Sequence, residues 1–181
     1  ALYKPGSGAD YYAVAKLAGE VALINASRAP DLSAVIVRPF NVAGPRQSRA
    51  GGFVVPRFVH QALSEQPLTV YGDGRAIRAF THVLDIVDGL LRATRRGDGK
   101  ASVYNLGNLA NRTTILDLAH LVLRRTGSAS PIAHIDPREL HGAWFAEAGD
   151  KFPDSNLATR ELDWHPTRDL EQIVRDAIDT K

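Results

Sequence analysis

The apolar positions of this chain follow two patterns in turn, helical spacing and short unbroken runs. Residues 10–26 carry apolar side chains three and four positions apart and no proline, which predicts a helix. Residues 33–38 contain the run Ala-Val-Ile-Val, which is typical of a strand covered on both faces of a parallel sheet. Helical and strand patterns keep alternating downstream, and this alternation predicts an α/β fold.

The downstream pattern predicts a series of short elements. Expected helices span residues 53–63, 84–93, 114–127, 157–162 and 170–178, and expected strands span residues 68–71, 103–107 and 131–135. The turn sequence Gly72-Asp-Gly74 is typical of a hairpin, so we expect residues 75–82 to return beside strand 68–71. This return would bring Arg78 near Tyr71. Residues 137–152 show no regular pattern and are expected to be irregular.

Local signals define the helix expected after strand 103–107. Thr113 or Thr114 suits its N-terminal cap, because Thr114-Ile-Leu-Asp117 fits an acidic variant of the capping box. We expect the helix to end at Gly127.

Composition limits the classes of protein to consider. The 181 residues, 44% of them hydrophobic and 23% charged, suit one globular domain or the larger part of one. The net charge is +2 and no basic run exceeds a pair, so no nucleic-acid partner is expected. The absence of cysteine excludes disulfides and thiolate metal sites and fits a cytoplasmic location. No apolar run approaches the roughly 20 residues of a membrane span, so no membrane partner is expected.

Several common kinds of catalytic and binding site find no support in the sequence. The 6 histidines form no His-x-His or four-residue pair, so no metal site is predicted. Neither the Gly-x-Ser-x-Gly elbow of hydrolases nor the Gly-x-Gly-x-x-Gly phosphate loop occurs. An unrelated hydrolase of the α/β class would require a serine and a histidine to converge in space.

Tyr12 and Lys16 form a candidate acid–base pair on the first predicted helix. Residues four apart lie on the same helix face, so the phenol and the ammonium can approach a common point. A nearby cation stabilises a phenolate, which a tyrosine needs in order to accept a proton near neutral pH. The spacing by itself is a weak signal, because chance also produces it.

Asn41 and Arg78 are candidates for binding an anionic organic substrate. Asn41 follows the apolar strand 33–38 in a turn, and in α/β sheets ligands gather where parallel strands end. Arg78 has a planar guanidinium that can hold phosphate through two hydrogen bonds. The alternatives are a turn residue for Asn41, a loop stiffener for the neighbouring Pro39, and a surface ion pair for Arg78.

The order of motifs along the chain is more specific than any one of them. The motifs are Tyr12-x-x-x-Lys16, Arg38-Pro-Phe-Asn-Val-Ala-Gly-Pro-Arg-Gln47, Val55-Pro-Arg-Phe58, Pro67-Leu-Thr-Val-Tyr-Gly-Asp-Gly-Arg-Ala-Ile-Arg-Ala-Phe80, His82-Val-Leu-Asp-Ile-Val87, Val103-Tyr-Asn-Leu-Gly107 and Leu162-Asp-Trp-His-Pro166. Together they resemble the extended short-chain dehydrogenase/reductase family. The similarity is to its NAD-dependent epimerase/dehydratase branch, which includes UDP-glucose 4-epimerases and UDP-glucuronate decarboxylases.

The resemblance implies the C-terminal part of a doubly wound Rossmann-type parallel sheet plus a smaller α/β substrate-binding domain. Residues 1–45 would complete the NAD-binding domain and carry the Tyr12 helix. Residues 46–181 would mainly form the nucleotide-sugar-binding domain, with segments near 80–107 returning to the Rossmann domain. The resemblance also implies NAD or NADP as cofactor, a nucleotide sugar such as a UDP-sugar as substrate, and a homodimer.

The resemblance assigns the chemistry and the cofactor contacts to four residues. Tyr12 would be the acid/base that helps to move a hydride between sugar and nicotinamide. Lys16 would bind the nicotinamide ribose and support the Tyr12 phenolate. Pro39 and Val42 would line the nicotinamide pocket.

The resemblance assigns substrate contacts to a second group of residues. Asn41 would contact the diphosphate and Arg78 its phosphate oxygens. Val70 and Tyr71 would pack near the base with Arg57 beside it, although sheet packing is the alternative for the two strand residues. Lys151 is the only cation where the branch carries an arginine for a second phosphate contact. Trp164 is expected to be a packed anchor between the last helices.

The family pattern also includes parts that this chain lacks. The glycine-rich dinucleotide fingerprint, the ribose-binding acid and the catalytic Ser/Thr precede the tyrosine in the family, and the chain begins at Ala1 without any Met. We therefore expect an enzyme represented by its C-terminal half and inactive alone. The alternative is a non-catalytic fragment or remnant that binds a nucleotide sugar or a partner, which an exposed apolar face would favour. The identity of the sugar nucleotide, and the choice among epimerisation, dehydration, decarboxylation and reduction, stay open.

Overall fold

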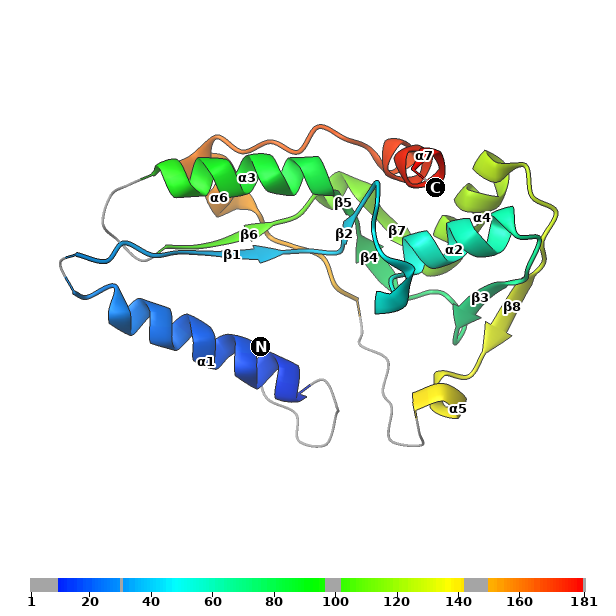
Figure 1. Cartoon of the computed structure of the whole chain (residues 1–181), viewed down its shortest axis with the longest axis horizontal. Helices are drawn as coiled ribbons and strands as arrows, with labels where there is room; N and C mark the ends of the chain where they lie inside the picture. Colours follow the sequence, from blue (N-terminus) through cyan, green and yellow to red (C-terminus); the bar gives the residue numbers. More distant parts are fainter. Residues whose placement is uncertain (1–9, 30, 97–101, 142–149, 181) are drawn as a thin grey trace.

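The computed structural model describes residues 10–29, 31–96, 102–141 and 150–180 (Figure 1). Its helices confirm those expected from the sequence, and its elements alternate as expected for an α/β fold. In chain order the elements are α1 (Asp10–Ala26), β1 (Val35–Pro39), β2 (Val42–Ala43), η1 (Arg49–Gly51), α2 (Val54–Leu63), β3 (Leu68–Tyr71), β4 (Ile77–Ala79), β5 (Thr81–His82), α3 (Val83–Arg95), β6 (Ser102–Leu106), η2 (Leu109–Asn111), β7 (Arg112–Thr114), α4 (Ile115–Thr126), β8 (Ile132–Ile135), α5 (Pro137–His141), α6 (Asn156–Leu162) and α7 (Leu170–Asp179).

Most strand pairs in the described residues are parallel. β1 pairs with β6 from Val35 opposite Ser102 to Pro39 opposite Leu106, and β2 pairs with β5. β3 pairs with β8, also in parallel, whereas β4 and β7 are antiparallel. Parallel pairing joins segments that are distant in the sequence, and Figure 1 shows β6 beside β1 and β8 beside β3.

The predicted hairpin after β3 is wrong. Gly72 and Gly74 have positive φ angles, as in a tight turn, but the chain leaves the turn toward β7. The backbone N–H groups of Leu116 and Ile115, at the start of α4, donate to the carbonyls of Gly74 and Ala76. These bonds draw the segment after the turn to α4, while β8 takes the place beside β3.

The expectation of an irregular segment from residue 137 is also wrong for its first residues, which form α5. Pro137 occupies the first helical position, where proline is well tolerated. The Asp136 carboxylate accepts a hydrogen bond from the backbone N–H of Arg138 at 2.9 Å, which caps the helix. Residues 142–149 lie outside the described part of the chain.

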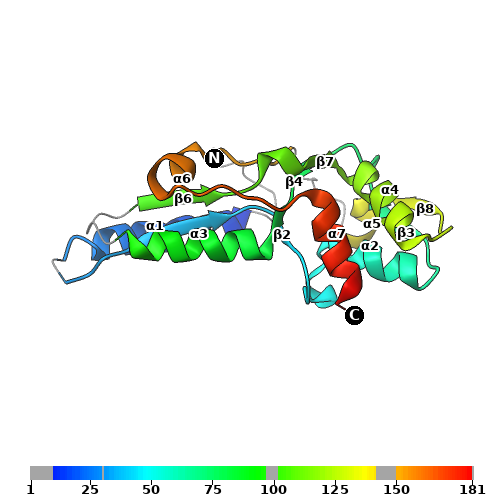
Figure 2. The ribbon, with the colours of Figure 1, turned by 90° about the horizontal axis from the view of Figure 1, so that it is seen from above.

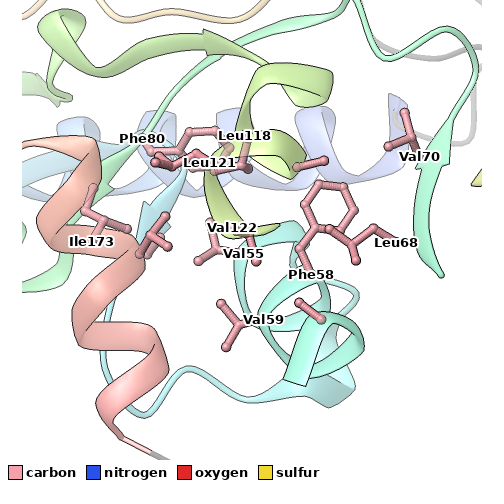
Figure 3. Packing of buried hydrophobic residues seen from close by; sticks show 14 residues of the cluster. Val55, Phe58, Val59, Leu68, Val70, Phe80, Leu118, Leu121, Val122 and Ile173 are labelled. Atoms are coloured by element: carbon pink, nitrogen blue, oxygen red, sulfur yellow. The ribbon is translucent and has the colours of Figure 1, made fainter. Parts of the chain in front are cut away.

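The buried apolar side chains form two clusters. The first lies among α2, β3, α4 and α7, where Phe58, Leu68 and Leu118 are fully buried (Figure 3). The second lies among α3, β6 and α6 and includes Leu106 and Trp164. Trp164 is completely buried and donates its indole N–H to the carbonyl of Asp85 at 2.8 Å, which confirms its expected role as a packed anchor.

A polar junction of five buried residues separates the two clusters: Thr81, His82, Asp85, Asn108 and Asn111. The Asp85 carboxylate accepts hydrogen bonds from the Arg168 side chain at 2.5 Å and from its backbone N–H at 3.1 Å. The side-chain amides of Asn108 and Asn111 donate to the Arg168 carbonyl at 3.1 and 2.9 Å. The strap of residues 164–168 is therefore bonded to the start of α3 and to the segment after β6.

The first helix differs from the others in its exposure. α1 runs beside the β1–β6 pair (Figures 1 and 2). Its exposed large apolar side chains are Tyr11, Tyr12, Val14, Leu17, Val21, Leu23 and Ile24. A helix that is apolar around its circumference is normally buried. Within the described residues, no helix has both the length and the apolarity required to cross a membrane.

We expect Gly89→Ala to destabilise the fold by about 1–2 kcal/mol, because overpacking outweighs the better helix propensity of alanine. A Cβ at Gly89 would lie 2.4 Å from Leu106 Cδ1 and 2.9 Å from Trp164 Nε1. Gly19→Ala in α1 is the matched control, because nothing lies within 4 Å of its Cβ position. Urea denaturation followed by tryptophan fluorescence measures both, and equal stability of the two variants would contradict the packing argument.

Candidate functional site

A cavity of about 300 Å³ lies where β2, α2, β3 and β4 meet. Five of the residues selected from the sequence line it: Asn41, Val42, Arg57, Tyr71 and Arg78. The other lining residues are Ala43, Gln47, Gly52, Phe53, Val54, Val55, Phe80 and Ile115. The lining contains two arginines and no carboxylate, so the cavity suits an anionic ligand with an apolar or aromatic part.

Asn41 adopts a conformation that few residues tolerate. Its φ of 39° lies in the left-handed region, where asparagine is enriched. Its side-chain amide donates to the Ala79 carbonyl at 3.0 Å, and its own carbonyl accepts from the Thr81 N–H at 3.1 Å. Asn41 therefore serves as a turn residue that joins the end of β1 to β4 and β5, and it also lines the cavity.

Arg57 carries a charge into a largely buried place. Its guanidinium lies 4.5 Å from the centre of the Tyr71 ring, and Nη2 donates to the Thr69 carbonyl at 3.1 Å. Its Nε–H is buried and has no hydrogen-bond partner. Burial lowers the pKa of Arg57 from its ordinary value, although a guanidinium stays protonated in proteins. An anion or a carbonyl oxygen of a ligand would satisfy this donor.

Arg78 and Lys151 are brought together by the backbone. Residue 151 forms an isolated parallel bridge with Arg78, and its N–H donates to the Ile77 carbonyl at 3.1 Å. The neighbouring Asp150 carboxylate accepts from the Ile77 N–H at 2.9 Å. Lys151 is exposed, so this bridge places a second cation next to Arg78 from a segment distant in the sequence.

Five of the residues selected from the sequence do not line the cavity: Tyr12, Lys16, Pro39, Val70 and Lys151. Val70 is fully buried in the first cluster and paired in the sheet, as its sheet-packing alternative supposed, so it offers a ligand no surface. Pro39 ends β1 and is exposed. Thus β1 brings Asn41 and Val42 to the cavity but leaves Pro39 outside its lining.

Tyr12 and Lys16 are neighbours, as their spacing predicted. The Lys16 ammonium lies 5.5 Å from the centre of the Tyr12 ring, which is a cation–π distance. Tyr12 exposes 70% of its surface on α1. The phenol and the ammonium therefore offer hydrogen-bond donors on an exposed face of the helix. Neither residue lines the cavity.

Gln47 is a cavity residue that the sequence did not indicate. Its side-chain N–H donates to the Val42 carbonyl at 3.0 Å, and its Oε1 is buried without a partner. Gln47 ends the motif that begins at Arg38, but nothing in that motif indicates a binding role for a glutamine, so only the folded position reveals it. Among the described residues, no group of three histidine, aspartate or glutamate side chains could hold a metal ion.

Sequence and structure comparisons place this chain among known enzymes. A profile of the NAD dependent epimerase/dehydratase family matches residues 2–107. UDP-N-acetyl-alpha-D-glucosaminuronate decarboxylase of Bacillus cytotoxicus is 32% identical over 151 residues, which cover 81% of this chain and 46% of that protein. UDP-glucuronic acid decarboxylase 2 of Arabidopsis thaliana is 35% identical over 162 residues, which cover 89% and 34%.

A solved structure shows the same arrangement. UDP-glucuronic acid 4-epimerase from Bacillus cereus, in complex with UDP-glucuronic acid and NAD, matches with a TM-score of 0.82 and 26% identity. The match covers 93% of this chain and 51% of the epimerase. The chain belongs to the NAD-dependent epimerase/dehydratase family of extended short-chain dehydrogenases/reductases. It spans about half, or less, of the length of these relatives.

We expect Asn41→Ala to cost about 2 kcal/mol of stability, about 1 for the lost hydrogen bond and about 1 for the left-handed φ. Asn41→Gly loses the hydrogen bond but tolerates the φ, so it should be the more stable of the two variants. Urea denaturation measures the difference. Equal stability of the two variants would show that the backbone conformation imposes no demand at this position.

Proposed function

We propose that the whole protein containing this chain is an NAD(P)-dependent nucleotide-sugar epimerase/dehydratase, similar to UDP-glucose 4-epimerase or UDP-glucuronate decarboxylase. The observation that carries the proposal is the cavity that groups Asn41, Arg57, Tyr71 and Arg78 without any acidic lining residue. Such a lining fits the diphosphate and the aromatic base of a nucleotide sugar. The relatives support a UDP-sugar in particular, because their names or bound ligands contain one.

In this proposal the substrate lies along the cavity from the edge of β4 to α2. Arg78 and the neighbouring Lys151 hold the phosphates, with Asn41 beside them. Arg57 and Tyr71 hold the base, and the unpaired Nε–H of Arg57 gains a ligand oxygen. Val70 is fully buried and makes no contact with the base. Satisfying the unpaired Nε–H of Arg57 makes substrate binding more favourable.

Tyr12 and Lys16 supply the proton chemistry in this proposal. When NAD is bound, it supplies the hydride acceptor of the reaction. The Tyr12 phenolate takes the proton of a sugar hydroxyl, and the resulting phenol can return it, while the Lys16 ammonium stabilises the phenolate and binds the ribose. Pro39 and the apolar Val42 lie on the nicotinamide side.

The domain division stays part of the proposal. Residues 1–45, with segments near 80–107, belong to the cofactor-binding domain, and the remainder of 46–181 mainly binds the substrate. A cytoplasmic location and a homodimer are likewise expectations for the whole protein.

A second candidate applies to this chain by itself, namely a nucleotide-sugar-binding or interaction module without catalytic activity. The exposed apolar face of α1 favours it, because such a face indicates a surface that another segment or partner covers. The two candidates differ in turnover and share the nucleotide site.

We expect Arg78→Ala to weaken UDP binding by about tenfold to a hundredfold, since a charge-assisted hydrogen bond to phosphate is lost. Arg75→Ala is the matched control. Arg75 is an exposed arginine between the turn of residues 72–74 and β4, and its Nε lies 3.7 Å from Asp73 Oδ2. Isothermal titration calorimetry with UDP measures both. Unchanged affinity in the Arg78 variant would remove this residue from the site.

We expect Tyr12→Phe to lower turnover at least about a hundredfold, because general acid–base catalysis is lost. Turnover is measured on the chain extended to the full length of its relatives, with UDP-glucose and UDP-glucuronic acid as substrates. UDP affinity should stay within about twofold, since Tyr12 lies outside the cavity. Unchanged turnover would refute the catalytic assignment of Tyr12.

A further inference from the structure

Glu20 is the exception to the exposure of α1. Every other side chain from residue 11 to residue 26 is exposed, whereas Glu20 is partly buried and its side chain is only 15% exposed. A surface helix normally exposes its carboxylates to water. The least exposed position on this stretch of the helix is therefore a charged one, and its partner explains why.

Arg38 of β1 binds both carboxylate oxygens of Glu20. Arg38 Nε donates to Oε1 at 2.6 Å, and Nη2 donates to Oε2. This is the two-bond, planar pairing that only arginine makes with a carboxylate. The hydrogen bond from Arg38 holds the pKa of Glu20 below its ordinary value, so the carboxylate stays ionised. In the part of the chain that the structure describes, this pairing joins α1 to β1.

The pairing joins the two segments that carry the candidate catalytic and cofactor residues. Glu20 follows Lys16 by one helical turn and Tyr12 by two. Arg38 immediately precedes Pro39 and is itself fixed in the sheet opposite Asn105 of β6. Arg38, which is held in the sheet, thus connects β1 to α1 one helical turn from Lys16.

Arg38 also affects which partner Lys16 can take. Lys16 and Glu20 are opposite charges four residues apart on a helix, a spacing at which such side chains can pair. Because Arg38 occupies both carboxylate oxygens, the Lys16 ammonium lies against the Tyr12 ring at 5.5 Å.

We propose that Glu20 and Arg38 are positioning residues that clamp the Tyr12–Lys16 helix to the end of β1 and keep Glu20 away from Lys16. The helix position that this clamp sets is independent of the reaction, whereas its effect on turnover rests on the proposed function. Neither residue lines the cavity, so the clamp acts on the Tyr12 side of the site and not on nucleotide binding.

The first experiment measures the clamp without any reaction, by amide hydrogen exchange of this chain. We expect Glu20→Gln to raise the exchange rates of α1 by at least about tenfold, because a detached single helix of this length is marginal in water. The amides of β1 and β6 should be unchanged. The matched control is Glu171→Gln, which breaks the exposed Arg125–Glu171 pair between α4 and α7. Equal α1 exchange in the Glu20 variant and the control would overturn the clamp.

The second experiment measures kcat and KM on the chain extended to the full length of its relatives. We expect Glu20→Gln to lower kcat about tenfold while KM for the UDP-sugar stays within about twofold. Exchanging the two residues, Glu20→Arg with Arg38→Glu, should restore part of the lost kcat, which a merely destabilising change would not do. An exchanged pair as slow as the single variant would overturn the proposal.

The experiments distinguish failure of the proposed function from failure of the clamp. If Tyr12→Phe keeps full turnover, the proposed function fails, yet the exchange experiment still decides whether the clamp holds α1. If Tyr12→Phe is inactive and Glu20→Gln matches Glu171→Gln in both experiments, the proposed function stands and the clamp is refuted.

Discussion

Asp85 accepts hydrogen bonds from the side chain and the backbone of Arg168 in the buried space between the two hydrophobic clusters. A buried carboxylate is tolerated only when it is paired and hydrogen-bonded, so this pairing dictates how the last strap of the chain meets α3. The strap in turn carries Trp164 into the second cluster and leads to α7 in the first. The neighbouring Thr81 N–H binds the Asn41 carbonyl, so the turn that lines the cavity takes its position from this junction.

Local signals predicted the elements well, because each rests on chemistry within a few residues. Thr114 accepts a hydrogen bond from the Asp117 N–H at 3.0 Å, and Gly127 ends α4 with a φ of 66°, both as expected. Strand pairing was predicted less well. The predicted hairpin after Tyr71 does not form because β3 pairs with β8 and β4 pairs with β7, while the start of α4 binds the segment between them. No local pattern near the turn encodes these distant partners.

The candidate site shows the same division between local and distant causes. Motif order selected Asn41, Arg57, Tyr71 and Arg78 without any knowledge of their contacts, and the fold gathers them around one cavity. Motif order did not indicate a role for Gln47, because the burial of its unpaired Oε1 arises only when the chain folds. Nor could it reveal that Lys151 reaches Arg78 through backbone pairing. The position of Glu20 against Arg38 is a tertiary contact of the same kind, although Arg38 begins one of the motifs.

The uniform apolarity of α1 has a consequence for the behaviour of the molecule in solution. The two clusters bury their own apolar surface, but α1 offers water few polar side chains and keeps its tyrosines and leucines exposed. Surfaces of this kind promote nonspecific association. α3 adds the exposed side chains of Leu84, Val87, Leu90 and Leu91. The concentration at which the chain can be handled, and its recognition by quality-control machinery in a cell, will therefore depend on what covers these two helices as well as on the stability of its cores.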